Sequence, residues 1–129
     1  MHQKIFRTAA ILGLIAVALG AFGAHGLRDK ISVQDLENWK TAANYQFVHA
    51  LVLLVISGTS VNQKIKINNA ALLFILGIIC FSGSLYLLAT RAITGISTAV
   101  LGPVTPIGGL LLILGWLFLI IAPVKKTDA

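Results

Sequence analysis

The chain has 129 residues, of which 57% are hydrophobic and only 11% are charged, and its mean hydropathy is +0.92. An ordinary soluble domain carries roughly 25% charged residues, so this composition excludes a soluble globular protein. The net charge of +6 does not indicate binding to nucleic acid, because the sequence has no basic stripe interleaved with aromatic residues.

Four long segments contain no Asp, Glu, Lys or Arg, and they are residues 8–27, 41–63, 67–90 and 92–124. A helix needs about 20 mostly apolar residues to cross a bilayer, so each segment is long enough for one span. The sequence therefore predicts an all-α fold, a four-span antiparallel transmembrane helix bundle that forms one domain over residues 1–129. The expected spans are residues 8–27, 41–57, 70–89 and 106–121.

The first expected span has small residues on one helix face, at Ala9, Gly13, Ala16, Gly20 and Gly23. Small residues let transmembrane helices approach closely, so this face is predicted to pack against another helix. A cleaved signal peptide is an alternative interpretation of the segment. The apolar stretch of about 20 residues and the three spans that follow favour a retained helix.

The second helix is expected to begin near Val33, before its membrane-spanning part. Ser32 followed by Asp35 resembles a capping box, with Asp in place of Glu. Trp39 lies where an aromatic residue is expected at the membrane interface, and Gly58 is a candidate for the C-terminal stop.

The third helix has Asn69 as its candidate N-cap. A link over residues 91–105 follows, long enough for an interfacial turn or a short extra helix. Thr105 and Pro106 then have the pattern of an N-cap and a first helical position, and Pro123 is expected to end the fourth span. Further small residues that predict packing faces are Ala70, Gly77 and Ser84 in the third span, and Gly108 and Gly115 in the fourth.

The distribution of Lys and Arg favours an orientation with both termini in the cytoplasm. In a four-span topology one side of the membrane holds six basic residues, which are Lys4, Arg7, Lys64, Lys66, Lys125 and Lys126. The other side holds four, which are Arg28, Lys30, Lys40 and Arg91, together with three acids. We therefore expect a multi-pass protein of the bacterial plasma membrane, the inner membrane, with that orientation.

Polar side chains from four helices gather in one leaflet, the expected non-cytoplasmic one, when their depth is counted from a helix rise of about 1.5 Å per residue. This polar cluster consists of His25, Tyr45, Gln46, His49, Ser82, Ser84, Tyr86 and Thr105. One interpretation is a layer of interhelical hydrogen bonds. The other is a small polar pocket that binds a ligand, a proton or a lipid headgroup.

Several kinds of chemistry find no support in the sequence. No expected span contains Asp, Glu, Lys or Arg, which argues against a carboxylate-coupled transporter. No acid lies near the polar cluster to complete a Ser–His–acid set, so we expect no enzyme activity. The single Cys80 excludes an all-cysteine metal site, and His25 and His49 have no obvious third ligand. We expect no metal and no cofactor.

Four motifs in order resemble one known family, and the resemblance covers nearly the whole chain. They are Gly20–Leu27 (GAFGAHGL), Trp39–Ala42 (WKTA) with Tyr45-Gln46 and His49–Leu51 (HAL), Phe81–Tyr86 (FSGSLY), and Thr105–Gly109 (TPIGG) with Gly115-Trp116. The chain is similar to the domain-of-unknown-function 423 family of small bacterial inner-membrane proteins. That resemblance implies a four-helix membrane protein and no established activity, and it adds weight to seven members of the polar cluster, all except Thr105.

The expected function is that of a non-enzymatic accessory or structural membrane protein. Its partners would be the lipid bilayer and either a second copy of the chain or another membrane protein, with no nucleic acid. The alternative is a protein that handles a small solute, a proton or a lipid headgroup through the polar cluster.

Overall fold

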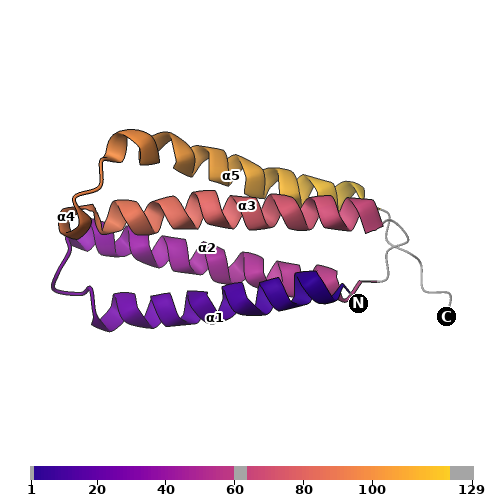
Figure 1. Ribbon diagram of the computed structural model, residues 1–129, viewed down its shortest axis with the longest axis horizontal. Coiled ribbons are helices and arrows are strands. Elements are labelled where there is room, and N and C mark those ends of the chain that lie inside the picture. The colour runs from indigo at the N-terminus through magenta and orange to yellow at the C-terminus, as the bar shows by residue number, and fades with distance from the viewer. Residues whose placement is uncertain (1, 60–63, 123–129) are drawn as a thin grey trace.

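The computed structural model describes residues 2–59 and 64–122 as helices joined by short turns, with no strand in these two ranges. The helices are α1 (Gln3–His25), α2 (Val33–Ser57), α3 (Lys64–Ala89), α4 (Arg91–Thr94) and α5 (Thr98–Ile121), as Figure 1 shows. The predicted all-α class is confirmed for this part of the chain.

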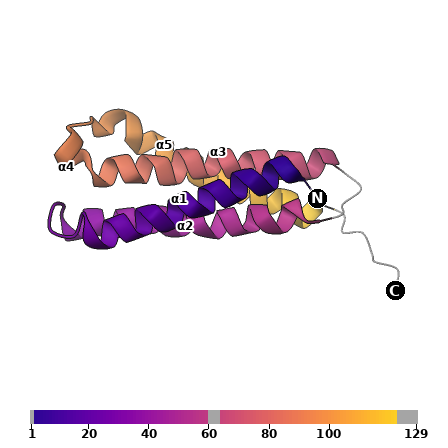
Figure 2. The same ribbon diagram turned by 60° about the horizontal axis from the view of Figure 1, so that its bottom comes forward.

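The helices α2 and α3 form the middle pair of the molecule, with α1 and α5 on opposite sides of that pair (Figures 1 and 2). α1 packs on α2, α2 packs on α3, and α3 packs on α5. The start of α1 lies beside the end of α2, because the His2 N–H donates to the Ser57 carbonyl at 2.8 Å. The α1–α2 loop and α4 lie together at the opposite end, here called the loop end (Figure 1).

Three of the four long helices in the described ranges, α1, α3 and α5, are long and apolar enough to cross a membrane. α2 has 25 residues and is equally long, but its first turns are charged and Asn44, Gln46 and His49 lower its hydropathy. The helices thus give three candidate spans where the sequence predicts four.

The N-terminus of α2 has the predicted cap. The Ser32 hydroxyl accepts a hydrogen bond from the Asp35 N–H at 3.1 Å, and the helix begins at Val33. Gly58 follows the last helical residue, and its N–H bonds to the final turn of α2. A side-chain cap of this kind partners an N–H that the helix itself leaves unsatisfied.

Two predicted helix starts are wrong, both by several residues. α3 begins at Lys64, so Asn69 is an exposed residue inside the helix, and the added turn buries Ile67 in the core. α5 begins at Thr98 with Ser97 as its N-cap, so Thr105 is no cap and Pro103 and Pro106 lie inside the helix. The prediction that Pro123 ends this helix, and the basic residues Lys125 and Lys126, lie outside the described residues.

The early start of α5 has a physical reason. A proline removes one helical hydrogen bond, but backbone groups exposed to lipid have few partners other than their own helix. The helix therefore continues through both prolines. The predicted link over residues 91–105 shrinks to the short helix α4 and residues 95–97, where Gly95 adopts a left-handed conformation (φ 72°) to end α4.

The interface between α3 and α5 is built on glycine. Three glycines lie at contact points, where Gly77 meets Leu112, Gly108 meets the backbone of Cys80 and Phe81, and Gly115 meets Phe74. At Gly108 a Cβ atom would overlap the backbone of Phe81, so only glycine permits this approach. The packing faces predicted for the third and fourth spans therefore meet each other, with each glycine against a larger residue or the backbone of the other helix.

The interface between α1 and α2 also uses small residues. Ala9, Ala16 and Gly23 are the buried residues of α1, and Gly23 lies against the indole ring of Trp39. Gly20 belongs to the predicted packing face, yet no atom of another segment lies within 4 Å of the place where its Cβ would be. The predicted face is therefore correct for most of its length and fails at this position.

Candidate functional site

Gln46 on α2 joins three helices at the centre of the polar cluster. Its Nε2 donates to the Leu12 carbonyl of α1 at 2.9 Å, and its Oε1 accepts from the Tyr86 hydroxyl of α3 at 2.9 Å. Gln46 is 4% exposed, so both ends of its amide are used inside the protein. An amide that is satisfied in this way holds the helices in one register and has little capacity left for a ligand.

His49 lies one turn further along α2 and turns toward α5. Its Nδ1 is 2.7 Å from the Tyr45 carbonyl, and its Nε2 accepts from the Trp116 indole N–H at 3.2 Å. Since an indole only donates, Nε2 carries the lone pair and Nδ1 carries the hydrogen. Phe74 packs beside both rings, with ring centroids 5.6 Å from each. The imidazole is thus a neutral side chain with both nitrogens occupied.

The hydroxyl groups of the cluster also bond to other helices. Ser82 donates to the Ala42 carbonyl of α2 at 2.7 Å, which ties α3 to α2. Ser84 and Thr105 lie 2.7 Å apart and tie α3 to α5. Thr105 therefore has the place in the cluster that the sequence predicts, although it lies inside a helix and not at its start.

Two members of the predicted cluster stand apart from this network. His25 is the last residue of α1 and is exposed, with no hydrogen bond to another member within the described residues. Tyr45 is 45% exposed, and its ring packs on Phe81 with centroids 4.6 Å apart. A partly open pocket of about 420 Å³ lies beside it, lined by Asn44, Tyr45, Val48 and His49.

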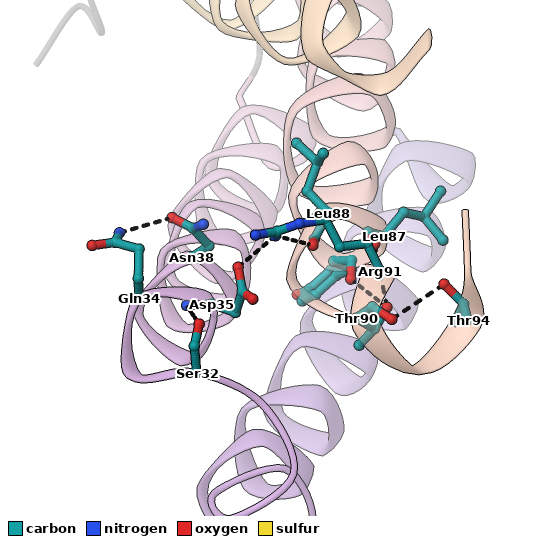
Figure 3. Close-up of polar contacts among 10 residues, drawn as sticks. Ser32, Gln34, Asp35, Asn38, Leu87, Leu88, Thr90, Arg91 and Thr94 are labelled. Carbon is teal, nitrogen blue, oxygen red and sulfur yellow. Dashed lines mark hydrogen bonds and ion pairs between the residues drawn. The ribbon is translucent and has the colours of Figure 1, made fainter. Parts of the chain in front are cut away.

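An ion pair at the loop end was not predicted from the sequence. The carboxylate of Asp35 on α2 lies 2.6 Å from the guanidinium of Arg91 on α4, and Asp35 is buried while Arg91 is half exposed (Figure 3). Arg91 also donates to the Leu88 carbonyl at 2.7 Å. The sequence marks Asp35 only as part of a capping box, because nothing in it shows that a residue 56 positions later lies alongside.

Two tryptophans were also missed as members of the polar network. The Trp39 indole N–H donates to the Leu19 carbonyl of α1 at 2.7 Å, and its ring meets Tyr86 edge-on with centroids 4.6 Å apart. Trp116 reaches from α5 to His49. The interfacial position of Trp39 was a signal for an anchor, but neither spacing nor composition predicts these two donors.

The buried polar side chains of the cluster find their hydrogen-bond partners within the protein. Every buried side-chain nitrogen and oxygen in the described residues has a partner within the protein. No group of three or more His, Cys, Asp or Glu side chains comes together there in a way that could hold a metal ion. The residues that face outward beside this network are Asn44 and Tyr45, at the pocket.

A family model described as "Protein of unknown function (DUF423)" matches residues 19–109. The chain belongs to this family. The matched range contains all eight residues of the predicted polar cluster, and it excludes Trp116. The DUF423 resemblance that the sequence motifs carry is thereby confirmed.

Curated relatives of this DUF423 chain are membrane proteins by name. It is 47% identical over 116 residues to a UPF0382 membrane protein of Staphylococcus epidermidis, covering 90% of this chain and 91% of the relative. It is 42% identical over 118 residues to the UPF0382 membrane protein YwdK of Bacillus subtilis, covering 90% and 92%. These names state no activity. No solved structure matches the chain.

Proposed function

We propose that this DUF423 protein is a non-enzymatic accessory or structural protein of the bacterial inner membrane, which acts through the shape of a rigid bundle. The observation that supports it is the reciprocal bonding of the polar cluster. Gln46, His49, Ser82 and Ser84 are buried and bonded to neighbouring helices. Side chains bound in this way stabilise packing and are poorly placed to exchange protons with a substrate.

The proposal includes α2 as the fourth span. α2 lies between α1 and α3, its last residue bonds to the start of α1, and Asp35 near its first residue bonds to Arg91 after the end of α3. A helix with both ends level with those of its neighbours crosses the same layer as they do. Gln46 and His49, two of the polar side chains that lower its hydropathy, face neighbouring helices, which is where a bilayer-spanning helix tolerates them.

The proposed orientation places both termini in the cytoplasm and the loop end on the other side of the membrane. The support is the excess of Lys and Arg on the side of the termini, six residues against four. A phosphatase fused to the C-terminus should be inactive, and a fluorescent protein fused there should be bright. An active phosphatase with a dark fluorescent fusion would reverse the orientation.

The accessory role requires a companion in the membrane. Cross-linking in native membranes, followed by purification in mild detergent, should yield a stoichiometric complex with another membrane protein or with a second copy. A chain that remains monomeric and without a companion after cross-linking would contradict the proposal.

Substitution of His49 separates a structural role from a chemical one. His49→Gln keeps a group that can accept from Trp116 but cannot exchange a proton near neutral pH. We expect this variant to complement a deletion strain as well as the wild-type protein does. A folded His49→Gln protein that fails to complement it would instead assign proton chemistry to the cluster. Ser82→Ala, a second variant in the same network, controls for a general loss of packing.

A further inference from the structure

A pocket beside α2 opens outward next to the polar network. Asn44, Tyr45, Val48 and His49 line it, with a volume of about 420 Å³, and it is called the Asn44 pocket below. His49 is 5% exposed and forms its inner wall, while Tyr45 and Val48 are about half exposed. The pocket therefore faces the surroundings of the bundle along one side of α2.

Two hydrogen-bonding groups at this pocket point away from the network. Neither the Asn44 amide nor the Tyr45 hydroxyl bonds to another residue in the described part of the chain, although the Tyr45 carbonyl is used by His49. In a bilayer a polar group without a partner is costly, because lipid chains offer none. These two groups are thus suited to a partner from outside the chain that supplies hydrogen-bond acceptors.

The order of side chains along α2 matches the layers of a bilayer. Lys40, Asn44 and Val48 follow at intervals of four residues and share a helix face. A separation of four residues is about 6 Å along the axis. That is roughly the thickness of the interfacial layer on each side of the hydrocarbon core. A cation, an amide and an apolar side chain are therefore spaced along α2 like a lipid phosphate, its ester groups and its acyl chains.

Lys40 is available for such an interaction. Its ammonium group lies 3.0 Å from the carboxylate of Glu37, but both side chains are more than half exposed. An exposed ion pair of this kind contributes little, so exchange of the carboxylate for a phosphate costs little.

We propose that the Asn44 pocket binds one diacyl phospholipid. The Lys40 ammonium donates to the phosphate, and the Asn44 amide and the Tyr45 hydroxyl donate to the ester carbonyls. An acyl chain lies against Val48 and the wall formed by His49. The proposal goes beyond the accessory role and does not depend on a companion protein.

A lipid fits this face better than a second helix does. The exposed residues of α2 on the membrane side of Asn44 are bulky, and they are Phe47, Val48, Leu51 and Val55. Close helix–helix contact in membranes relies on small residues. The alanines of α2, which are Ala42, Ala43 and Ala50, are buried inside the bundle and contribute nothing to this outer face. A flexible acyl chain can fill a concavity beside large side chains without such a surface.

Photolabelling of the full chain tests the proposal. The protein is reconstituted in vesicles of phosphatidylethanolamine and phosphatidylglycerol that contain a trace of phosphatidylcholine with a photoreactive acyl chain. We expect labelling concentrated at residues 44–49. Asn44→Leu and Tyr45→Phe each remove one hydrogen bond to the lipid, so each should reduce this labelling about three- to tenfold.

Matched variants separate lipid binding from folding. Asn69→Leu makes the same change at an exposed asparagine of α3 toward the other end of the bundle, and it should leave the labelling at residues 44–49 unchanged. Asn44→Leu should unfold at the same temperature as the wild type, because Asn44 has no partner among the described residues.

Two results would overturn the proposal. The first is labelling spread evenly over the outer faces of all long helices and indifferent to Asn44→Leu, which indicates only the ordinary lipid annulus. The second is a disulfide-linked dimer through Asn44→Cys in a Cys80→Ser background in native membranes, which assigns the face to a second copy of the chain.

Discussion

The two sides of the middle helix pair are joined to their neighbours by different means. Between α3 and α5 glycines let the backbones approach until Gly108 lies against the backbone of Phe81. Around α2 the helices are held by side-chain hydrogen bonds, such as those of Gln46 to α1 and α3. Lipid chains are as apolar as the side chains they meet, so neither interface gains from the expulsion of water. The molecule therefore relies mainly on close packing between α3 and α5, and it adds side-chain hydrogen bonds to small-residue packing around α2.

The long helices differ in how much they depend on their neighbours for stability in a bilayer. α3 and α5 are apolar enough to cross a bilayer by themselves, and their contact adds tight packing. α2 carries Asn44, Gln46 and His49, which raise the cost of exposing it to lipid. Its neighbours supply partners for Gln46 and His49, so α2 needs the bundle more than α1, α3 or α5 does. A substitution that changes side-chain volume should thus destabilise the α3–α5 interface. A substitution that changes side-chain polarity should destabilise the contacts of α2 with its neighbours.

The largest effect is expected at the glycine interface. Gly108→Ala adds a Cβ atom where the backbone of Phe81 already lies, so α5 must move away from α3 along its length. Overpacking of this kind costs about 3 kcal/mol in the free energy of unfolding. Reversible unfolding by a denaturing detergent in mild-detergent micelles measures it.

Two other glycines of the same helices provide the control for this prediction. Gly83 on α3 and Gly102 on α5 have no atom of another segment within 4 Å of an added Cβ. Gly83→Ala and Gly102→Ala should leave the free energy of unfolding unchanged or raise it slightly, since alanine favours a helix over glycine. If Gly102→Ala lowered the free energy of unfolding as much as Gly108→Ala does, helix propensity or flexibility, and not contact with the other helix, would explain the effect.

The next largest effect is expected for the ion pair at the loop end. Asp35→Ala removes a buried carboxylate whose partner, Arg91, is partly open to solvent. Loss of a hydrogen bond to a charged group costs about 2 kcal/mol, measured in the same unfolding experiment. Glu37→Gln breaks the exposed pair with Lys40 on the same helix and should cost less than about 0.5 kcal/mol. Equal losses of unfolding free energy in Asp35→Ala and Glu37→Gln would mean that burial of Asp35 does not strengthen its ion pair.

The sequence predicts the two interfaces unequally well. Helix class, the start of α2 and the glycine faces follow from local patterns, namely run length, a capping box and the spacing of small residues. The polar network cannot be predicted from local patterns, because its interhelical bonds join residues 20 to 67 positions apart. The depth of the residues in the membrane still places Gln46, Ser82, Ser84, Tyr86 and Thr105 in one leaflet. Depth alone cannot say that Gln46 turns inward while Tyr45, next to it, turns outward.

A smaller effect is expected at the centre of the polar interface. Gln46→Leu removes two interhelical hydrogen bonds and leaves the Tyr86 hydroxyl and the Leu12 carbonyl without that partner. Such bonds contribute about 0.6 kcal/mol each in membranes, so the loss should be about 1 kcal/mol. Asn44→Leu makes a similar change two residues away, outside the network, and should cost nothing. A Gln46→Leu protein as stable as the wild type would show that the hydrogen bonds of Gln46 do not stabilise the bundle.

The smallest effect is expected where the two kinds of interface meet, at the hydroxyl pair between α3 and α5. Thr105→Val keeps the shape of the side chain but removes the 2.7 Å contact with Ser84, which can still donate to the Phe81 carbonyl. The loss should therefore be about 0.6 kcal/mol. Ser84→Ala and the double variant complete a mutant cycle that isolates the coupling between the two hydroxyls. A coupling near zero would mean that glycine packing alone holds α5. A coupling near 0.6 kcal/mol would mean that even the close-packed interface gains stability from a polar contact at its loop end.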